Sequence, residues 1–195
     1  MFTLKHIVAI IILTALMAIA GCGQDENEIS KLNSSIEELT GGAFKVPLND
    51  DYPLLYAFVR KPPVEVDNGP YFITLQYSFK GGNVGDGYQE DVIGAVEISQ
   101  DITILYGPYD ATTSIMIEYS PVFKDAGVSG ADETGSWIIN GQEVDYAYTD
   151  RQGREIIGVY LNLDEAGINA TYLLSDEFTE EDAKEFTVYL VNELY

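Results

Sequence analysis

The chain has 195 residues, of which 32 are acidic and 10 are basic, so its formal net charge at pH 7 is −22. This length suits one domain with a substantial core, and the charge excludes nucleic acid as a partner because phosphates would repel the protein. The same charge argues against electrostatic docking on anionic lipid headgroups, and the single cysteine excludes a disulfide within the chain.

The first residues have the pattern of a targeting segment. Lys5 precedes an apolar run from residue 7 to residue 19, which is shorter than the roughly 20 residues that span a bilayer. The run ends in Ile19-Ala20-Gly21-Cys22, which resembles the lipobox of bacterial lipoproteins: an aliphatic residue, two small residues and a cysteine. The resemblance implies that residues 1–21 are a cleaved signal peptide, and that Cys22 carries a diacylglycerol and often a further acyl chain such as palmitate.

A lipidated Cys22 predicts a location and excludes several kinds of chemistry. Two or more acyl chains hold a protein stably at a bilayer, so we expect this chain on the extracytoplasmic side of the cell membrane. His6, the only histidine, leaves with the signal peptide. The remaining chain then lacks the groups for Ser-His-Asp or Cys-His catalysis and for a zinc site of His or Cys. The alternative is an uncleaved N-terminal helix with an incidental cysteine.

Residues 22–42 are predicted to hold the lipidated cysteine, a short tether and a helix. The tether runs from Gly23 to about Asn27, and Gly41 and Gly42 end the helix. Apolar residues recur within the helix at spacings of three and four, the pattern of an amphipathic helix: Ile29, Leu32, Ile36 and Leu39. A helix this short is marginal alone, so we expect it to dock on the domain rather than to associate with a second copy.

From Phe44 onward the pattern changes to that of strands. Three segments alternate apolar and polar residues, at 71–79, 96–106 and 115–119, and Pro121 closes the third. The second segment predicts either one long strand or a hairpin that turns near Gln100. Its apolar residues share one parity: Val96, Ile98, Ile102, Ile104 and Tyr106.

The clearest local signal is Asn140-Gly141 between two alternating runs. Both residues tolerate the positive φ of a type I′ turn, so a two-residue hairpin is predicted here. Its register pairs Ile139 with Gln142, Trp137 with Val144, and Gly135 with Tyr146. One apolar face of the hairpin then carries Trp137, Ile139, Val144, Tyr146 and Tyr148.

The chain ends in two predicted strands and a helix. The strands lie at 157–163 and 171–174, with a turn at 164–169, and Thr179 with Asp182 has the spacing of a capping box. The apolar side of the helix carries Ala183, Phe186, Leu190 and Leu194. Residues 43–195 are therefore predicted to form a single α+β domain: a twisted antiparallel sheet, a meander of about seven or more strands, with the C-terminal helix packed on it, plus the short N-terminal helix.

Two long turn-rich segments, 61–70 and 80–91, are candidate binding loops. Next to the second loop, Ser78 and Lys80 lie two apart on one strand face and can mimic a Ser-Lys dyad. A structural role for both residues at the end of an ordinary strand is the favoured interpretation.

Two acidic groups supply oxygen atoms in glycine-containing loops, where calcium could bind. The first group is Asp86, Glu90 and Asp91, and the second is Asp164 and Glu165. Neither follows the spacing of an EF-hand, so solvated turns are the favoured interpretation. No cofactor is predicted.

The 14 tyrosines raise the question of an aromatic binding surface. Tyr146 and Tyr148 share a face and can stack on sugars or contact a protein, but rings that fill the core beside Trp137 are the favoured interpretation. Paired carboxylates can also hydrolyse a glycoside, although with 32 acids some pairs lie close by chance.

A hairpin with Trp137 and Asn140-Gly141, then a meander, then a terminal helix opened by Thr179-Glu180-Glu181, is similar to a domain family of unknown function. That family occurs at the outer end of some anti-sigma factors and in lipoproteins of spore-forming Gram-positive bacteria. The similarity covers about residues 44–194. It implies an extracytoplasmic sensing or interaction module, with no known catalytic residues to transfer.

The sequence therefore predicts a membrane-anchored extracytoplasmic lipoprotein that acts as a non-catalytic binding, sensing or interaction module. Its contact with the membrane runs through the lipid on Cys22, and an envelope protein or a cationic ligand is the partner class that its charge favours. The alternative is a cell-envelope hydrolase that uses a carboxylate pair on a glycan. A cleft with two close acids would favour the enzyme, whereas a flat aromatic or acidic patch would favour binding.

Overall fold

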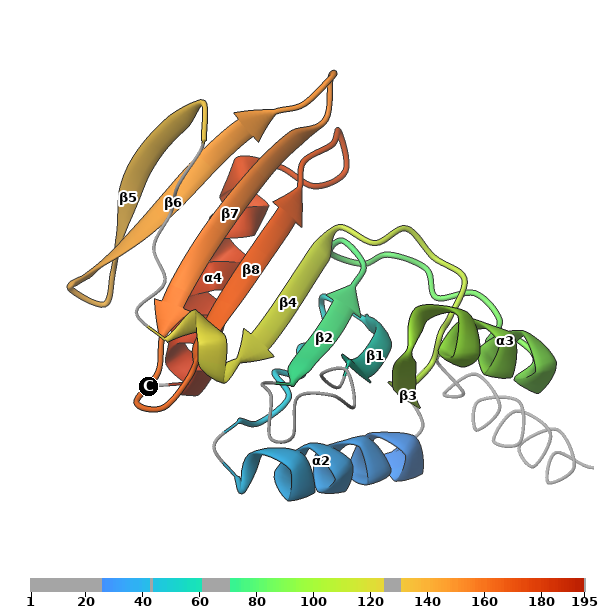
Figure 1. Ribbon diagram of the computed structural model, residues 1–195. Helices are drawn as coiled ribbons and strands as arrows, with labels where there is room; N and C mark the ends of the chain where they lie inside the picture. Colours follow the sequence, from blue (N-terminus) through green and yellow to red (C-terminus); the bar gives the residue numbers. More distant parts are fainter. Residues whose placement is uncertain (1–25, 43, 61–70, 125–130, 195) are drawn as a thin grey trace, which may run out of the picture.

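The computed structural model describes residues 26–42, 44–60, 71–124 and 131–194. Within these residues, eight strands form one sheet in the order β3-β1-β2-β4-β8-β7-β6-β5, and every neighbouring pair is antiparallel (Figure 1). The strands are β1 (Leu54–Arg60), β2 (Phe72–Tyr77), β3 (Ile102–Tyr106), β4 (Ile115–Ser120), β5 (Glu133–Ile139), β6 (Gln142–Asp150), β7 (Glu155–Asn162) and β8 (Gly167–Leu173). The predicted α+β class with a twisted antiparallel sheet is confirmed.

The two halves of the sheet are connected differently. Strands β5 to β8 follow one another as a meander, as predicted, whereas β1 pairs with both β2 and β3 and so separates them. No strand was predicted at Leu54–Arg60. Nearly all its residues are buried, so the strand lacks the alternation that marks a half-buried strand.

The core lies on one face of the sheet. Two neighbouring rows of buried side chains cross the same five strands, β1, β2, β4, β8 and β7, in register. One row is Val59, Ile73, Tyr119, Ile168 and Leu161, and the other is Ala57, Leu75, Ile117, Ala170 and Val159. Helix α4 (Glu180–Leu194) covers this face, and its Phe186 and Leu190 are fully buried. In Figure 1 the helix passes behind β7 and β8. The predicted packing of the C-terminal helix on the sheet is therefore confirmed.

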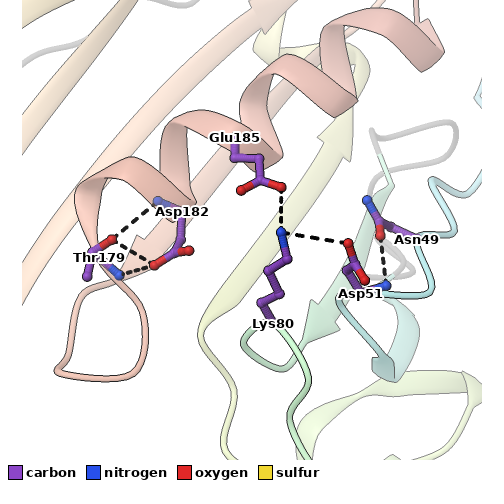
Figure 2. Close-up of polar contacts among 6 residues, drawn as sticks. All are labelled: Asn49, Asp51, Lys80, Thr179, Asp182 and Glu185. Atoms are coloured by element: carbon purple, nitrogen blue, oxygen red, sulfur yellow. Dashed lines mark hydrogen bonds and ion pairs between the residues drawn. The ribbon is translucent and has the colours of Figure 1, made fainter.

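The predicted capping box opens α4. The Thr179 backbone N–H donates to Asp182 Oδ2 over 2.8 Å, and the Asp182 N–H donates back to Thr179 Oγ1 over 3.4 Å (Figure 2). These bonds satisfy amide groups that a helix start otherwise leaves without partners. At the other end of the helix, Asn192 Oδ1 accepts from Asn140 Nδ2, which ties α4 to the tip of the β5–β6 hairpin.

The β5–β6 hairpin has the predicted register. Ile139 pairs with Gln142, Trp137 with Val144 and Gly135 with Tyr146. Asn140 and Gly141 have φ values of 52° and 80°, as the predicted turn requires.

Helix α2 (Glu26–Thr40) docks on the domain, as predicted. Leu32 and Ile36 are fully buried in the same core as α4, and the helix contacts β3. Gly41 and Gly42 follow it with positive φ. The helix begins at Glu26, so the predicted tether to Asn27 was too long, and Cys22 lies outside the described residues.

The strand prediction for residues 96–100 was wrong. Residues Glu90–Gln100 form helix α3, which ends at Asp101 with a φ of 53°, and β3 starts only at Ile102. Glu90 and Asp91 in its first turn favour a helix because they face the positive end of the helix dipole. Ile98, taken as part of a buried strand face, is 87% exposed.

Two predicted loops also change. The loop predicted at 80–91 ends at Gln89, where α3 begins, and the turn predicted at 164–169 is shorter because β8 starts at Gly167. The third predicted loop, 61–70, lies outside the described residues.

Candidate functional site

No described helix packs over the middle of the sheet face opposite α4 (Figure 1). The short helix η1 (Pro121–Phe123) covers only one end of it, where Phe123 packs against Gly167 (Figure 1). We call the remaining surface the open face. It is formed by outward side chains of β4 to β8: Met116, Glu118, Thr134, Ser136, Ile138, Glu143, Asp145, Ala147, Thr149, Ile156, Gly158, Tyr160, Asn169, Thr171 and Leu173.

Small side chains leave space at the middle of the open face. Ala147, Gly158 and Thr171 lie side by side on β6, β7 and β8, and a Cβ built on Gly158 meets no atom within 4 Å. Tyr160 lies on one side of this row and Ile156 on the other, two residues away along β7. A bound chain can therefore approach the backbone of β7 between larger side chains.

The open face is acidic. Glu118 is half-buried and Glu143 and Asp145 are exposed, whereas none of the five strands from β4 to β8 contains a lysine or arginine. Asn169 Nδ2 donates to Glu118 over 3.3 Å, and Ser136 Oγ donates to Glu143 over 2.7 Å. Each carboxylate keeps acceptor capacity beyond its one neighbour, so the surface suits donors that carry positive charge.

The open face ends at β5, an edge strand with no described strand beside it. Because Ile139 and Gln142 close a two-residue turn, alternate residues of β5 direct their N–H and C=O groups away from β6. These are Thr134, Ser136 and Ile138, whose side chains also lie on the open face. Ile138 is 69% exposed. The edge thus offers backbone groups and an apolar side chain together.

Ser78 and Lys80 do not form a dyad. Ser78 Oγ is buried and has no hydrogen-bond partner among the described residues. Lys80 Nζ instead lies 2.7 Å from Glu185 Oε1 and 3.7 Å from Asp51 Oδ2 (Figure 2). The hydrogen bond to Glu185 raises the pKa of Lys80, so the amine stays protonated and is unsuited to act as a base. The favoured structural interpretation fits this arrangement, because Lys80 links α4 to the segment before β1.

The two acidic loops do not assemble a metal site within the part of the chain that the structure describes, where no group of three or more metal-binding side chains gathers. The segment around Asp86 is ordered by backbone pairing. The Gly85 N–H donates to the Asp110 carbonyl over 2.8 Å, and the Asp110 N–H donates to the Asp86 carbonyl over 3.2 Å.

Tyr146 and Tyr148 lie on the core face, as the favoured interpretation held. The Tyr146 ring stacks on Trp137 at a centroid distance of 4.7 Å. The Tyr148 hydroxyl donates to Glu155 Oε1 over 2.6 Å, and this bond raises the pKa of Tyr148 to about 12. The aromatic residue of the open face is Tyr160, which sequence analysis missed. Its position out of phase with Ile157, Val159 and Leu161 was the available signal.

Comparisons with protein-family models, with curated proteins and with solved structures found no match. Among the described residues, no helix is long and apolar enough to cross a membrane. The acidic sheet surface with one half-buried ring is therefore the feature from which a function is proposed below.

Proposed function

We propose that this protein is a lipid-anchored extracytoplasmic binding module that holds a basic polypeptide segment on its open face. The observation that carries the proposal is a five-strand surface with three carboxylates, an aromatic ring and no cationic side chain. The lipobox-like Ile19-Ala20-Gly21-Cys22 supports the anchor. Lysine and arginine side chains of a partner would pair with Glu118, Glu143 and Asp145.

A polypeptide suits the surface better than a small cation. The open face is wide, and the free edge of β5 can pair its backbone with an added strand, whose alternate side chains would then lie over the open face. Main-chain hydrogen bonds would supply affinity, and the carboxylates would select basic residues. An envelope protein with an exposed basic segment is the partner class that this chemistry describes.

The test is binding of a lysine-rich peptide to the full-length lipidated protein in detergent, measured by fluorescence anisotropy. We expect the triple variant Glu118→Gln, Glu143→Gln, Asp145→Asn to bind at least about tenfold more weakly, which corresponds to about 1.4 kcal/mol. Raised salt should weaken wild-type binding because exposed charges are screened.

A matched control removes three acids elsewhere: Glu37→Gln and Glu38→Gln on α2, and Glu177→Gln before α4, all exposed. This control should bind like wild type. Equal losses in both triple variants would mean that only net charge matters, and the open face would not be the site.

A further inference from the structure

The surface that meets the membrane follows from where α2 begins. Helix α2 starts at Glu26, four residues after Cys22. A fully extended chain covers at most about 3.6 Å per residue, so the two Cα atoms lie within about 14 Å. If Cys22 carries the lipid, as the proposed function requires, the first turn of α2 must stay close to the bilayer.

Helix α2 cannot swing away from the domain without breaking contacts. Leu32 and Ile36 are fully buried, and the Tyr109 hydroxyl donates to Glu28 Oε2 over 2.7 Å. Burial, the largest cause, and this bond raise the pKa of Tyr109 well above its ordinary value, so the hydroxyl keeps its proton at neutral pH. The part of the domain beside Glu28 and Tyr109 therefore lies nearest to the anchor.

Tyr88 lies directly beside this contact. Gly87 forms a bridge with Tyr109, and the Tyr88 N–H donates to the Pro108 carbonyl over 3.1 Å. Tyr88 leads into α3, which packs on β3, the same edge strand that α2 contacts. Figure 1 shows the first turn of α2, β3 and α3 gathered at one end of the sheet.

Three large apolar side chains are exposed at this end of the sheet. Tyr88 is 49% exposed, Val92 43% and Ile98 87%, and they are three of the seven large apolar residues exposed among the described residues. Val92, Ala95 and Ile98 lie on the solvent side of α3 together with the exposed Glu90 and Asp91 of its first turn, whereas Val96 and Glu97 turn inward and are half-buried. Scattered apolar residues need no explanation, but a group beside an anchoring point does.

Helix α3 is tied to the β3 edge by a side-chain hydrogen bond. Glu97 Oε1 accepts from the Ile104 backbone N–H over 2.8 Å, so α3 covers a free backbone group at the β3 edge. The solvent side of α3 therefore has a fixed orientation relative to β3 and α2.

We propose that Tyr88 and the solvent side of α3, with Val92 and Ile98, form a membrane-contacting surface that rests on the bilayer under the lipid anchor. Tyrosine suits the interface because its ring is apolar and its hydroxyl stays in the headgroup layer. Residues 83–101 contain Asp86, Glu90, Asp91, Glu97 and Asp101 but no lysine or arginine. Headgroup charge therefore does not attract this surface. Its contact rests on the apolar side chains, with the exposed carboxylates in the headgroup layer, and it favours zwitterionic lipid over anionic lipid.

This proposal differs from the expectation that only the lipid touches the membrane. Headgroup attraction is absent, but apolar side chains beside the anchor add a second contact. The far edge, β5, lies seven strand spacings from β3, about 34 Å along the sheet. The open face and the β5 edge are then presented away from the bilayer, where a partner can reach them.

The experiment places the full-length lipidated protein in phosphatidylcholine vesicles with or without brominated acyl chains, which quench nearby tryptophan. Tyr88→Trp and Val92→Trp are the reporters, and Ile138→Trp on β5 is the matched exposed control. Native Trp137 is 6% exposed and gives a constant background. We expect the added emission at 88 and 92 to fall at least about twofold, and that at 138 to stay unchanged.

A substitution, a change of lipid and a concentration series distinguish contact with the membrane from contact with a second copy. Ile98→Asp in the Tyr88→Trp background should reduce quenching while circular dichroism stays the same, and phosphatidylglycerol in the vesicles should reduce it further. Emission at 88 that changes with protein concentration in detergent would indicate that a second copy covers α3, and would overturn the proposal.

Flotation with the vesicles and the mass of Cys22-containing peptides test the anchor separately. A protein that floats but shows no quenching at 88, or equal quenching at 138, contradicts the membrane surface and leaves the anchor standing. A protein that neither floats nor carries lipid contradicts the anchor, and the membrane surface is overturned with it.

Discussion

The two edges of the sheet differ in how they are covered. At β3, helix α3 supplies Glu97 to the Ile104 N–H, and α2 packs Leu32 and Ile36 beneath the strand. At β5, no described strand pairs with the edge, and Ile138 is 69% exposed. Exposed edges invite pairing with other chains, and proteins usually block them. Within the described part of the chain, therefore, only the β5 edge offers backbone groups for pairing with another strand.

The difference arises from the connections. The 24 residues from 78 to 101 separate β2 from β3 along the chain, and they contain α3, which folds back over the β3 edge. Strands β5 and β6 are joined by a two-residue turn, which is too short to cover the β5 edge. Glu133 on β5 and Glu143 on the neighbouring β6 place like charges near this edge, which disfavours its pairing with a second copy.

Among the predictions, Leu32→Ala at the covered edge is expected to change stability the most. Leu32 is fully buried between α2 and the sheet, so we expect a loss of about 2–5 kcal/mol in the free energy of unfolding. Ile138→Ala at the free edge is the control and should change it by about 0.5 kcal/mol or less. Urea unfolding followed by circular dichroism measures both. Similar losses would mean that the two edges are packed alike.

Two glycine substitutions, at Gly135 on β5 and at Gly158 on β7, compare how tightly the two faces of this half of the sheet are packed. A Cβ on Gly135 would lie 2.6 Å from the Tyr146 ring, which is stacked on Trp137, whereas a Cβ on Gly158 meets no atom within 4 Å. Gly135→Ala should cost about 1–3 kcal/mol through overpacking. Gly158→Ala should be nearly neutral in the same urea measurement. A neutral Gly135→Ala would show that the Tyr146 ring moves freely.

The third prediction removes the cover of β3. Glu97→Ala leaves the Ile104 N–H without its partner, and we expect a loss of about 1 kcal/mol because the bond is only partly buried. Amide hydrogen exchange should become faster at Ile104 in particular. Glu90→Ala on the same helix, whose side chain is exposed, serves as the control, and unchanged exchange at Ile104 in Glu97→Ala would contradict the role of Glu97.

The smallest effect appears at alkaline pH. Burial raises the pKa of Tyr119 to about 12 from an unfolded value of about 10. The unfolded chain therefore loses this proton first, so the stability contribution is complete below pH about 10 and falls as pH rises towards about 12. Melting temperatures between pH 8 and pH 11 should fall less steeply in Tyr119→Phe than in wild type. An identical slope would assign the alkaline loss to other groups.

Local features were predictable because neighbouring residues decide them. The Asn140-Gly141 turn, the Thr179–Asp182 capping box and the period of α2 all depend on contacts within a few residues. Helix α3 was missed because Val96 and Ile98 fit a strand as well as one turn of a helix, and short apolar runs do not distinguish the two.

Of the candidate site, the sequence contained the acids but not their arrangement. Glu118 lies on one predicted strand and Glu143 and Asp145 on another, and nothing local shows that β4, β8, β7 and β6 lie in that order. Tyr146 and Tyr148 were correctly placed in the core by their phase with Trp137, and the same reasoning applied to β7 would have placed Tyr160 on the opposite face.

By itself, the sequence determined the helix–strand pattern of most of the chain, the β5–β6 register and the capped C-terminal helix, because hydrogen bonds and periodicity act over short separations. The tertiary structure alone decided that β1 lies between β2 and β3, that α4 covers one face of the sheet, and that α3 blocks the β3 edge whereas no described strand pairs with β5. These features depend on pairings between residues far apart in the chain, whose relative stability no short stretch of sequence contains.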